Sequence, residues 1–173
     1  MKTTLRMLTL CITIVSVTIG ACHKKDHPPK TLSKDDQFFI DQAGYANLDE
    51  ADAGALAAKM ATDSAVKAFG TQMVIEHTAA YLELKGIADG YDYNLPSSPD
   101  SLHMAMKDSL SMLTGHSFDS AYIAAQIKDH QAAVTLFTTE SQNGTGDLKN
   151  YAEKYLPHIQ EHLAKADSIQ AGF

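Results

Sequence analysis

From Asp35 onward, apolar residues recur three and four positions apart, with little sustained alternation between apolar and polar positions. This spacing is typical of amphipathic α-helices that bury one face. It predicts four long helices, over residues 35–61, 64–89, 119–141 and 147–170, and a short helix over 99–113. Ser33, followed by Asp36 three residues later, resembles a capping box at the start of the first long helix. The chain is therefore expected to be all-α.

The lengths of the connections predict how these helices pack. Short connections join the first long helix to the second and the third to the fourth, whereas residues 90–118 form a longer crossover that holds the short helix, with Ser98 as its expected cap. Two hairpins joined by one long crossover are the connectivity of ferritin-like four-helix bundles, so we expect that fold. The alternative is a pair of hairpins with the short helix packed as a lid. Gly54, Gly70 and Gly86 lie inside long helices, where they favour close helix approach.

Each long helix carries one side chain able to bind a metal on its apolar face. These residues are Glu50, His77, His130 and His162, with His158 at the edge of the apolar arc of the last helix. Glu50 and His77 are 12 and 15 residues from a turn near Thr62, so at about 1.5 Å per residue they lie at similar heights. His130 and His158 are equally far from Gly144, whereas His162 needs a tilt or a kink at Pro157 to reach their level.

Two interpretations of these buried polar residues stay open. Carboxylate and imidazole groups bind Zn, Fe, Mn or Cu, so the four residues are candidate metal ligands. In the other interpretation they form a structural polar layer. Glu50 would then accept a hydrogen bond from His77, and the other histidines would bond to tyrosine hydroxyls such as those of Tyr81 or Tyr155. The sequence favours the structural layer.

Motifs of the common enzyme classes are absent from the sequence. Di-iron members of the ferritin-like fold use Glu-x-x-His motifs, but Val74, Ile127 and Ile159 stand three residues before the histidines. The sequence also has no Gly-rich phosphate loop and no GxSxG, HExxH or CxxC motif. His103 and His116, in and after the short helix, are expected to be exposed. No catalytic residue is predicted, and a non-enzymatic role is favoured.

The N-terminal segment has the pattern of an exported lipoprotein. Lys2 and Arg6 precede an apolar run that is shorter than the roughly 20 residues of a membrane span. The sequence IGAC, ending at Cys22, resembles a bacterial lipobox. We therefore expect a signal peptide over 1–21, a lipid on Cys22, a flexible tether over 22–34 and a helical domain over 35–171. The alternative is ordinary secretion with Cys22 as a spare thiol.

The net charge of the chain limits the classes of partner that it can bind. The sequence has 14 Lys and Arg residues against 21 Asp and Glu residues, a formal net charge of −7. Such an acidic surface repels phosphate backbones, so nucleic-acid binding is not expected. The one predicted partner is a membrane, reached through the lipid anchor at Cys22.

Three sequence blocks carry a resemblance to a known family. They are QMVIEH at 72–77, KDHQ at 128–131 and LPHIQEHL at 156–163. With them, the chain from Asp35 to Gln170 resembles the domain of unknown function family DUF4142, bacterial exported proteins often labelled predicted outer membrane proteins. The resemblance implies a ferritin-like bundle, and Glu50, His77, His130 and His162 match the family's positions on its four helices.

These observations together predict an envelope lipoprotein, anchored in the outer membrane and facing the periplasm or the cell exterior. Its helical domain is expected to have a non-catalytic binding or stress-related role, with the polar layer as a structural element. The alternative is a metal-binding or redox protein that uses Glu50, His77, His130 and His162.

Overall fold

The computed structural model describes residues 31–173, and this part of the chain contains five α-helices and no strand. The helices are α1 (Lys34–Met60), α2 (Ser64–Asp89), α3 (Ser101–Ser111), α4 (Gly115–Asn143) and α5 (Gly146–Gln170). The predicted signal peptide, Cys22 and most of the tether lie outside the described residues. No helix of the described chain is long and apolar enough to cross a membrane.

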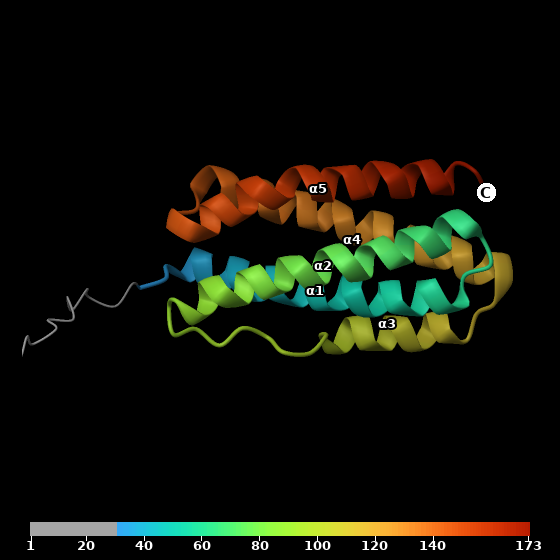
Figure 1. Ribbon diagram of the computed structural model, residues 1–173, viewed down its shortest axis with the longest axis horizontal. Coiled ribbons are helices and arrows are strands. Elements are labelled where there is room, and N and C mark those ends of the chain that lie inside the picture. Colours follow the sequence, from blue (N-terminus) through green and yellow to red (C-terminus); the bar gives the residue numbers. More distant parts are fainter. Residues whose placement is uncertain (1–30) are drawn as a thin grey trace, which may run out of the picture.

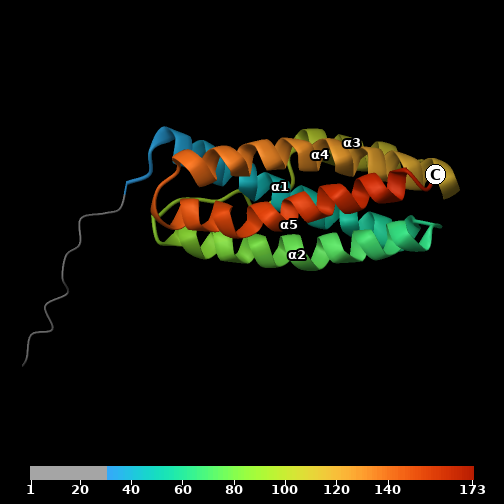
Figure 2. The same ribbon diagram turned by 90° about the horizontal axis from the view of Figure 1, so that it is seen from above.

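The four long helices form the predicted ferritin-like bundle. α1 packs with α2 as one hairpin and α4 packs with α5 as the other, and all four run along the same long axis (Figures 1 and 2). The crossover between α2 and α4 brings α3 along the outside of α1, where α3 also contacts α4 (Figure 1). The short helix is therefore an addition to the four-helix bundle, and its Leu110 extends one of the bundle's apolar clusters.

Capping residues explain where α1 and α3 begin. Ser33 and Asp36 form the predicted capping box at the start of α1, with Asp36 N donating to Ser33 Oγ over 3.0 Å. The predicted start of the short helix is wrong by two residues, because Asp100 and not Ser98 is its cap. The side chain of Asp100 accepts a hydrogen bond from His103 N at 2.8 Å.

α4 begins at Gly115, four residues before the predicted start at Asp119. The carboxylate of Asp119 bonds outside its own helix. It accepts hydrogen bonds from the backbone N–H groups of Thr62, at 3.0 Å, and Asp63, at 2.9 Å, in the turn between α1 and α2. Asp119, the predicted first residue of this helix, therefore joins α4 to a distant turn.

Two apolar clusters fill the bundle at opposite ends of its long axis. The first surrounds Phe39, Leu84 and Tyr151, and the second surrounds Phe69, Met73 and Tyr122. The buried residues between the two clusters are polar, among them Asn47, Glu50, His77, Gln126, His130 and His162. Buried polar groups are stable when they are bonded to each other or to a ligand. The bundle therefore has a polar layer at mid-height between two hydrophobic cores.

The crossing of α1 and α2 depends on two glycines. A Cβ added to Gly54 would lie 2.7 Å from the backbone oxygen of Gly70, and one added to Gly70 would lie 2.8 Å from Ala57 Cβ. Both distances are too short for real carbon contacts, so the predicted close approach is confirmed at this crossing. It is wrong for Gly86, where an added Cβ would meet nothing within 4 Å.

Candidate metal centre

Three histidines from three helices meet in the polar layer. His77 lies on α2, His130 on α4 and His162 on α5, and all three are buried. Their ring centroids are separated by 5.7 Å, 5.5 Å and 5.4 Å. Each ring offers one nitrogen atom, and these three nitrogens lie within 4.8 Å of one another. Residues that the sequence placed on separate helix faces thus form one cluster.

Hydrogen-bond acceptors fix the protonation of two of these rings. His130 Nδ1 lies 2.9 Å from the backbone oxygen of Gln126, and His162 Nε2 lies 2.9 Å from Glu76 Oε2. Carbonyl and carboxylate oxygens only accept hydrogen bonds, so these ring nitrogens carry the proton and donate. The other nitrogen of each neutral ring then has an unshared electron pair. Neither His130 Nε2 nor His162 Nδ1 has a partner among the described residues.

A chain of hydrogen bonds fixes the third ring in the same way. The Tyr151 hydroxyl donates to the backbone oxygen of Ala80 over 3.1 Å and accepts from Asn47 Nδ2 over 3.0 Å. Asn47 Nδ2 also donates to the backbone oxygen of Ala43 over 2.8 Å. The Asn47 oxygen therefore faces His77 Nδ1, 3.0 Å away, and that nitrogen must donate. His77 Nε2 is left with an electron pair and no partner within residues 31–173.

Burial keeps the three rings neutral. It lowers the pKa of His77 well below its usual range, with a further contribution from the other two histidines, and it lowers the pKa of His130 and of His162. A neutral imidazole is the form that binds metals. Histidines that bind metals usually donate their other ring N–H to a carboxylate, a backbone carbonyl or a similar acceptor, and all three rings do so here.

The size of the cluster is compatible with a metal ion after small side-chain movements. At the upper limit of 4.8 Å between each pair of nitrogens, a point equidistant from all three lies about 2.8 Å from each, compared with roughly 2.0–2.1 Å for a zinc–imidazole bond. Imidazole rings on helices close a gap of this size through small χ rotations within one rotamer well. The three residues therefore fit a metal in ligand type, protonation and spacing.

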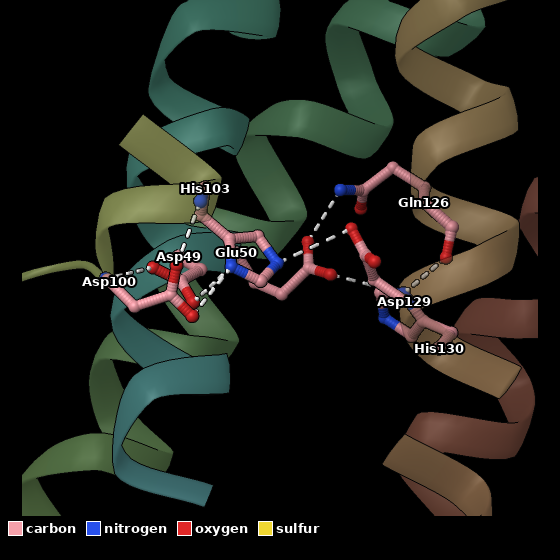
Figure 3. Close-up of polar contacts among 7 residues, drawn as sticks. All are labelled: Asp49, Glu50, Asp100, His103, Gln126, Asp129 and His130. Carbon is pink, nitrogen blue, oxygen red and sulfur yellow. Dashed lines mark hydrogen bonds and ion pairs between the residues drawn. The ribbon is translucent and has the colours of Figure 1, made fainter. Parts of the chain in front are cut away.

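Glu50 lies beside the three-histidine cluster, but its carboxyl group is not among the atoms that lie within 4.8 Å of one another. Its Oε1 is 3.5 Å from His130 Nδ1, which is the proton-bearing nitrogen of that ring (Figure 3). Gln126 Nε2 donates to Glu50 Oε2 over 2.6 Å (Figure 3). Burial raises the pKa of Glu50 to about 8, so the carboxyl group keeps its proton at neutral pH. The structure thus separates the four candidate ligands into three converging histidines and one neighbouring carboxyl group.

For the structural interpretation, the sequence predicted hydrogen bonds from His77 to Glu50 and from the other histidines to tyrosines. These predicted partners are wrong. Glu50 accepts from Gln126 and not from a histidine of α2. The hydroxyls of Tyr81 and Tyr155 donate to groups outside the cluster, a backbone oxygen of the crossover and a glutamate of α2. His158, at the edge of the apolar arc, is exposed. The polar side chains of the described chain therefore leave one nitrogen of each clustered histidine unbonded.

A second polar group, which the sequence did not predict, joins α3 to α1 and α4 (Figure 3). His103 Nδ1 lies 2.9 Å from Asp49 Oδ2 and 3.1 Å from Asp100 Oδ2, and its Nε2 lies 3.8 Å from Asp129 Oδ2. Asp129 and Asp49 raise the pKa of His103 to about 11, so this ring is a cation. Its predicted exposure is wrong because α3 lies over α1 at this point, whereas His116 is exposed as predicted.

A cavity of about 1430 Å³ is lined by the three histidines at its inner end and extends between the two hairpins towards the start of α1. Its apolar lining includes Phe39, Ala46, Ala80, Ala133, Phe137 and Ile159. Glu140 lies at the far end, near the start of α1. Burial, together with Asp36, raises the pKa of Glu140 to about 7. The candidate metal centre is therefore buried but adjoins a space that a small molecule can occupy.

Comparisons with known proteins agree with this architecture. The crystal structure of a DUF305 fragment from Deinococcus radiodurans is similar, with a TM-score of 0.74 over 83% of this chain and 100% of that chain. The two sequences are only 10% identical, so this likeness shows the fold alone. No curated protein matches the sequence. The family described as domain of unknown function DUF4142 matches residues 22–169, and the chain belongs to that family.

Proposed function

We propose that this protein binds a divalent transition-metal ion through His77, His130 and His162. One observation carries the proposal: three buried neutral imidazoles each leave one nitrogen unbonded, and the three rings bring one nitrogen each to within 4.8 Å of the others. An unpaired buried acceptor costs about 1–3 kcal/mol, and three neutral acceptors cannot satisfy each other. A metal ion bonds all three at once.

The chemistry of the ligand set narrows the choice of metal. Three neutral imidazoles suit Zn²⁺, Cu²⁺ and Fe²⁺ better than Mn²⁺, which prefers oxygen ligands. The carboxyl group of Glu50 lies against the proton-bearing edge of His130, and Glu76 lies against that of His162, so neither faces the shared space. The protein therefore supplies three ligands and leaves at least one coordination position free, as in metal sites that bind a further ligand.

Metal analysis of the purified protein tests the proposal. The wild-type protein, purified without chelator and then dialysed against Zn²⁺, is expected to retain about one metal ion per chain, because three histidine ligands suffice for a stable site. His77→Ala is expected to lose this metal. His116→Ala, which removes an exposed histidine, is the matched control and should retain it.

The same measurement separates the metal site from the structural interpretation. If the polar layer is only structural, and the domain acts by binding a partner at its surface, the wild type retains far less than one ion per chain. Its metal content is then unchanged by His77→Ala. That result would remove the metal-binding proposal and leave the non-catalytic binding role.

We also propose that the protein is a lipoprotein of the cell envelope. The sequence IGAC ending at Cys22 and the preceding apolar segment support this location. Growth with a radiolabelled fatty acid should label the wild-type protein and not Cys22→Ser. Equal labelling of both proteins would contradict the anchor at this residue.

A further inference from the structure

The cavity beside the three histidines has an apolar wall against which a ligand can bury part of its surface. The cavity lining combines apolar and acidic side chains, and Phe39, Ala46 and Ala80 of the first hairpin belong to its apolar part. Ala133 and Ile159 face them from the second hairpin. Ligand sites of about 300–1,000 Å³ hold most small organic molecules, so a cavity of about 1430 Å³ is large enough for an extended one.

The charge of the proposed metal site indicates which kind of group of a ligand would bind the ion. A divalent ion held by three neutral imidazoles receives no negative charge from its ligands, and a buried charge is more stable when an opposite charge contacts it directly. Glu50 and Glu76 contact the outer edges of His130 and His162, so neither carboxyl group can coordinate the ion without a rearrangement. The remaining coordination position therefore favours an anionic oxygen donor that comes from the cavity.

We propose that the cavity binds a carboxylic acid with an apolar body, whose carboxylate takes the coordination position left free by the three histidines. This inference rests on the proposed metal site. A carboxylate carries a single charge and is a normal oxygen ligand for Zn²⁺ and Fe²⁺. An apolar chain attached to it gains from burial against the alanine and aromatic walls, whereas a multiply charged phosphate would lose its hydration there.

Cobalt-loaded protein provides the test, because the visible spectrum of Co²⁺ changes when a new ligand enters its coordination shell. Acetate, hexanoate and decanoate are added in separate titrations. Each should change the spectrum, and the dissociation constant should fall about fourfold for each methylene that enters the cavity. Decylammonium, with the same chain and the opposite charge, should leave the spectrum unchanged.

A variant that narrows the cavity tests where the chain lies. Ala46→Phe should weaken decanoate binding at least tenfold and leave acetate binding unchanged, because acetate needs only the coordination position. Ala55→Phe is the control, since Ala55 is an exposed α1 residue that does not line the cavity. If Ala46→Phe does not fold, Ala133→Leu on the opposite wall replaces it. The cobalt spectrum without ligand shows that the metal site of each variant is intact.

Two results would overturn the inference while leaving the metal site in place. One is equal affinity for acetate and decanoate, and the other is a cobalt spectrum that no carboxylate changes. Decanoate binding of the same strength to metal-free protein would also contradict coordination by its carboxylate. A protein that shows no cobalt spectrum at all refutes the metal site itself, which the metal analysis with His77→Ala detects separately.

Discussion

Replacing Tyr151 by Phe tests whether the hydrogen bonds behind His77 prepare it to bind a metal. Tyr151 lies outside the three-histidine cluster, but its hydroxyl accepts from Asn47 Nδ2 and donates to the backbone of Ala80. Without that hydroxyl, one of the two contacts that orient the Asn47 amide is lost. The amide can then present its NH₂ group to His77, which favours the ring form whose free electron pair points away from the cluster.

The expected loss follows from the single supporting bond that disappears. Removing a hydrogen-bond partner behind a metal-binding histidine typically weakens metal binding by about 10- to 100-fold, which corresponds to about 1.4–2.7 kcal/mol. The apo protein should also lose about 1–2 kcal/mol of folding stability, because Asn47 Nδ2 gives up one of two acceptors in a buried site. Tyr151→Phe should therefore bind metal weakly yet remain folded.

Competition with a chromogenic chelator measures the zinc dissociation constant of each variant at pH 7.5. Tyr155→Phe is the matched control, because its ring lies 4.6 Å from that of Tyr151 while its hydroxyl bonds to Glu83, away from the histidines. The control should bind zinc like the wild type. Equal zinc affinity for Tyr151→Phe and the wild type would refute the reasoning that this chain of bonds sets the protonation of His77.

Two further predictions concern folding stability. Burial and Asp36 raise the pKa of Glu140 to about 7 from 4.5, so the folded chain holds this proton more tightly and stability falls as pH rises between these values. Denaturant titrations at pH 4 and pH 8 should show that Glu140→Gln reduces this loss of folding stability by about 1–2 kcal/mol. The same loss in the variant and the wild type would contradict a contribution from Glu140. Gly70→Ala should lower the free energy of unfolding by about 1–3 kcal/mol, because the added carbon meets the backbone of Gly54. Gly86→Ala should raise it by up to about 1 kcal/mol, and the opposite order of these two variants would refute the steric explanation.

Helix positions could be predicted because they depend on local information. The ends of α1 and α2 agree with the sequence, since the capping box at Ser33 and the break near Asp63 act within one turn of the helix. The starts of α3 and α4 were displaced by two and four residues. Asp119 shows why: the carboxylate of this predicted first residue bonds to the turn between α1 and α2, 56 positions away along the chain, and local spacing does not reveal such a contact.

The sequence predicted which residues form the candidate site but not the hydrogen bonds that they make. Helical spacing placed His77, His130 and His162 on buried faces, and all three are buried. The supporting residues Asn47 and Gln126 were missed, although each lies one turn from a predicted site residue on the same helix. A search for polar residues three or four positions before each buried ligand would have found them. The pairing of His103 with three aspartates gave no such signal, because two of the aspartates belong to other helices.

The sequence by itself determined that this chain is a helical bundle with a polar residue on the buried face of each long helix, because periodicity and capping act between near neighbours. It did not determine which atoms of those residues face one another. Only the tertiary structure decided that three imidazole nitrogens converge while Glu50 lies behind His130. The physical reason is that ring orientation and protonation depend on hydrogen bonds between helices, such as the one from Asn47 to Tyr151, which joins residues 104 positions apart.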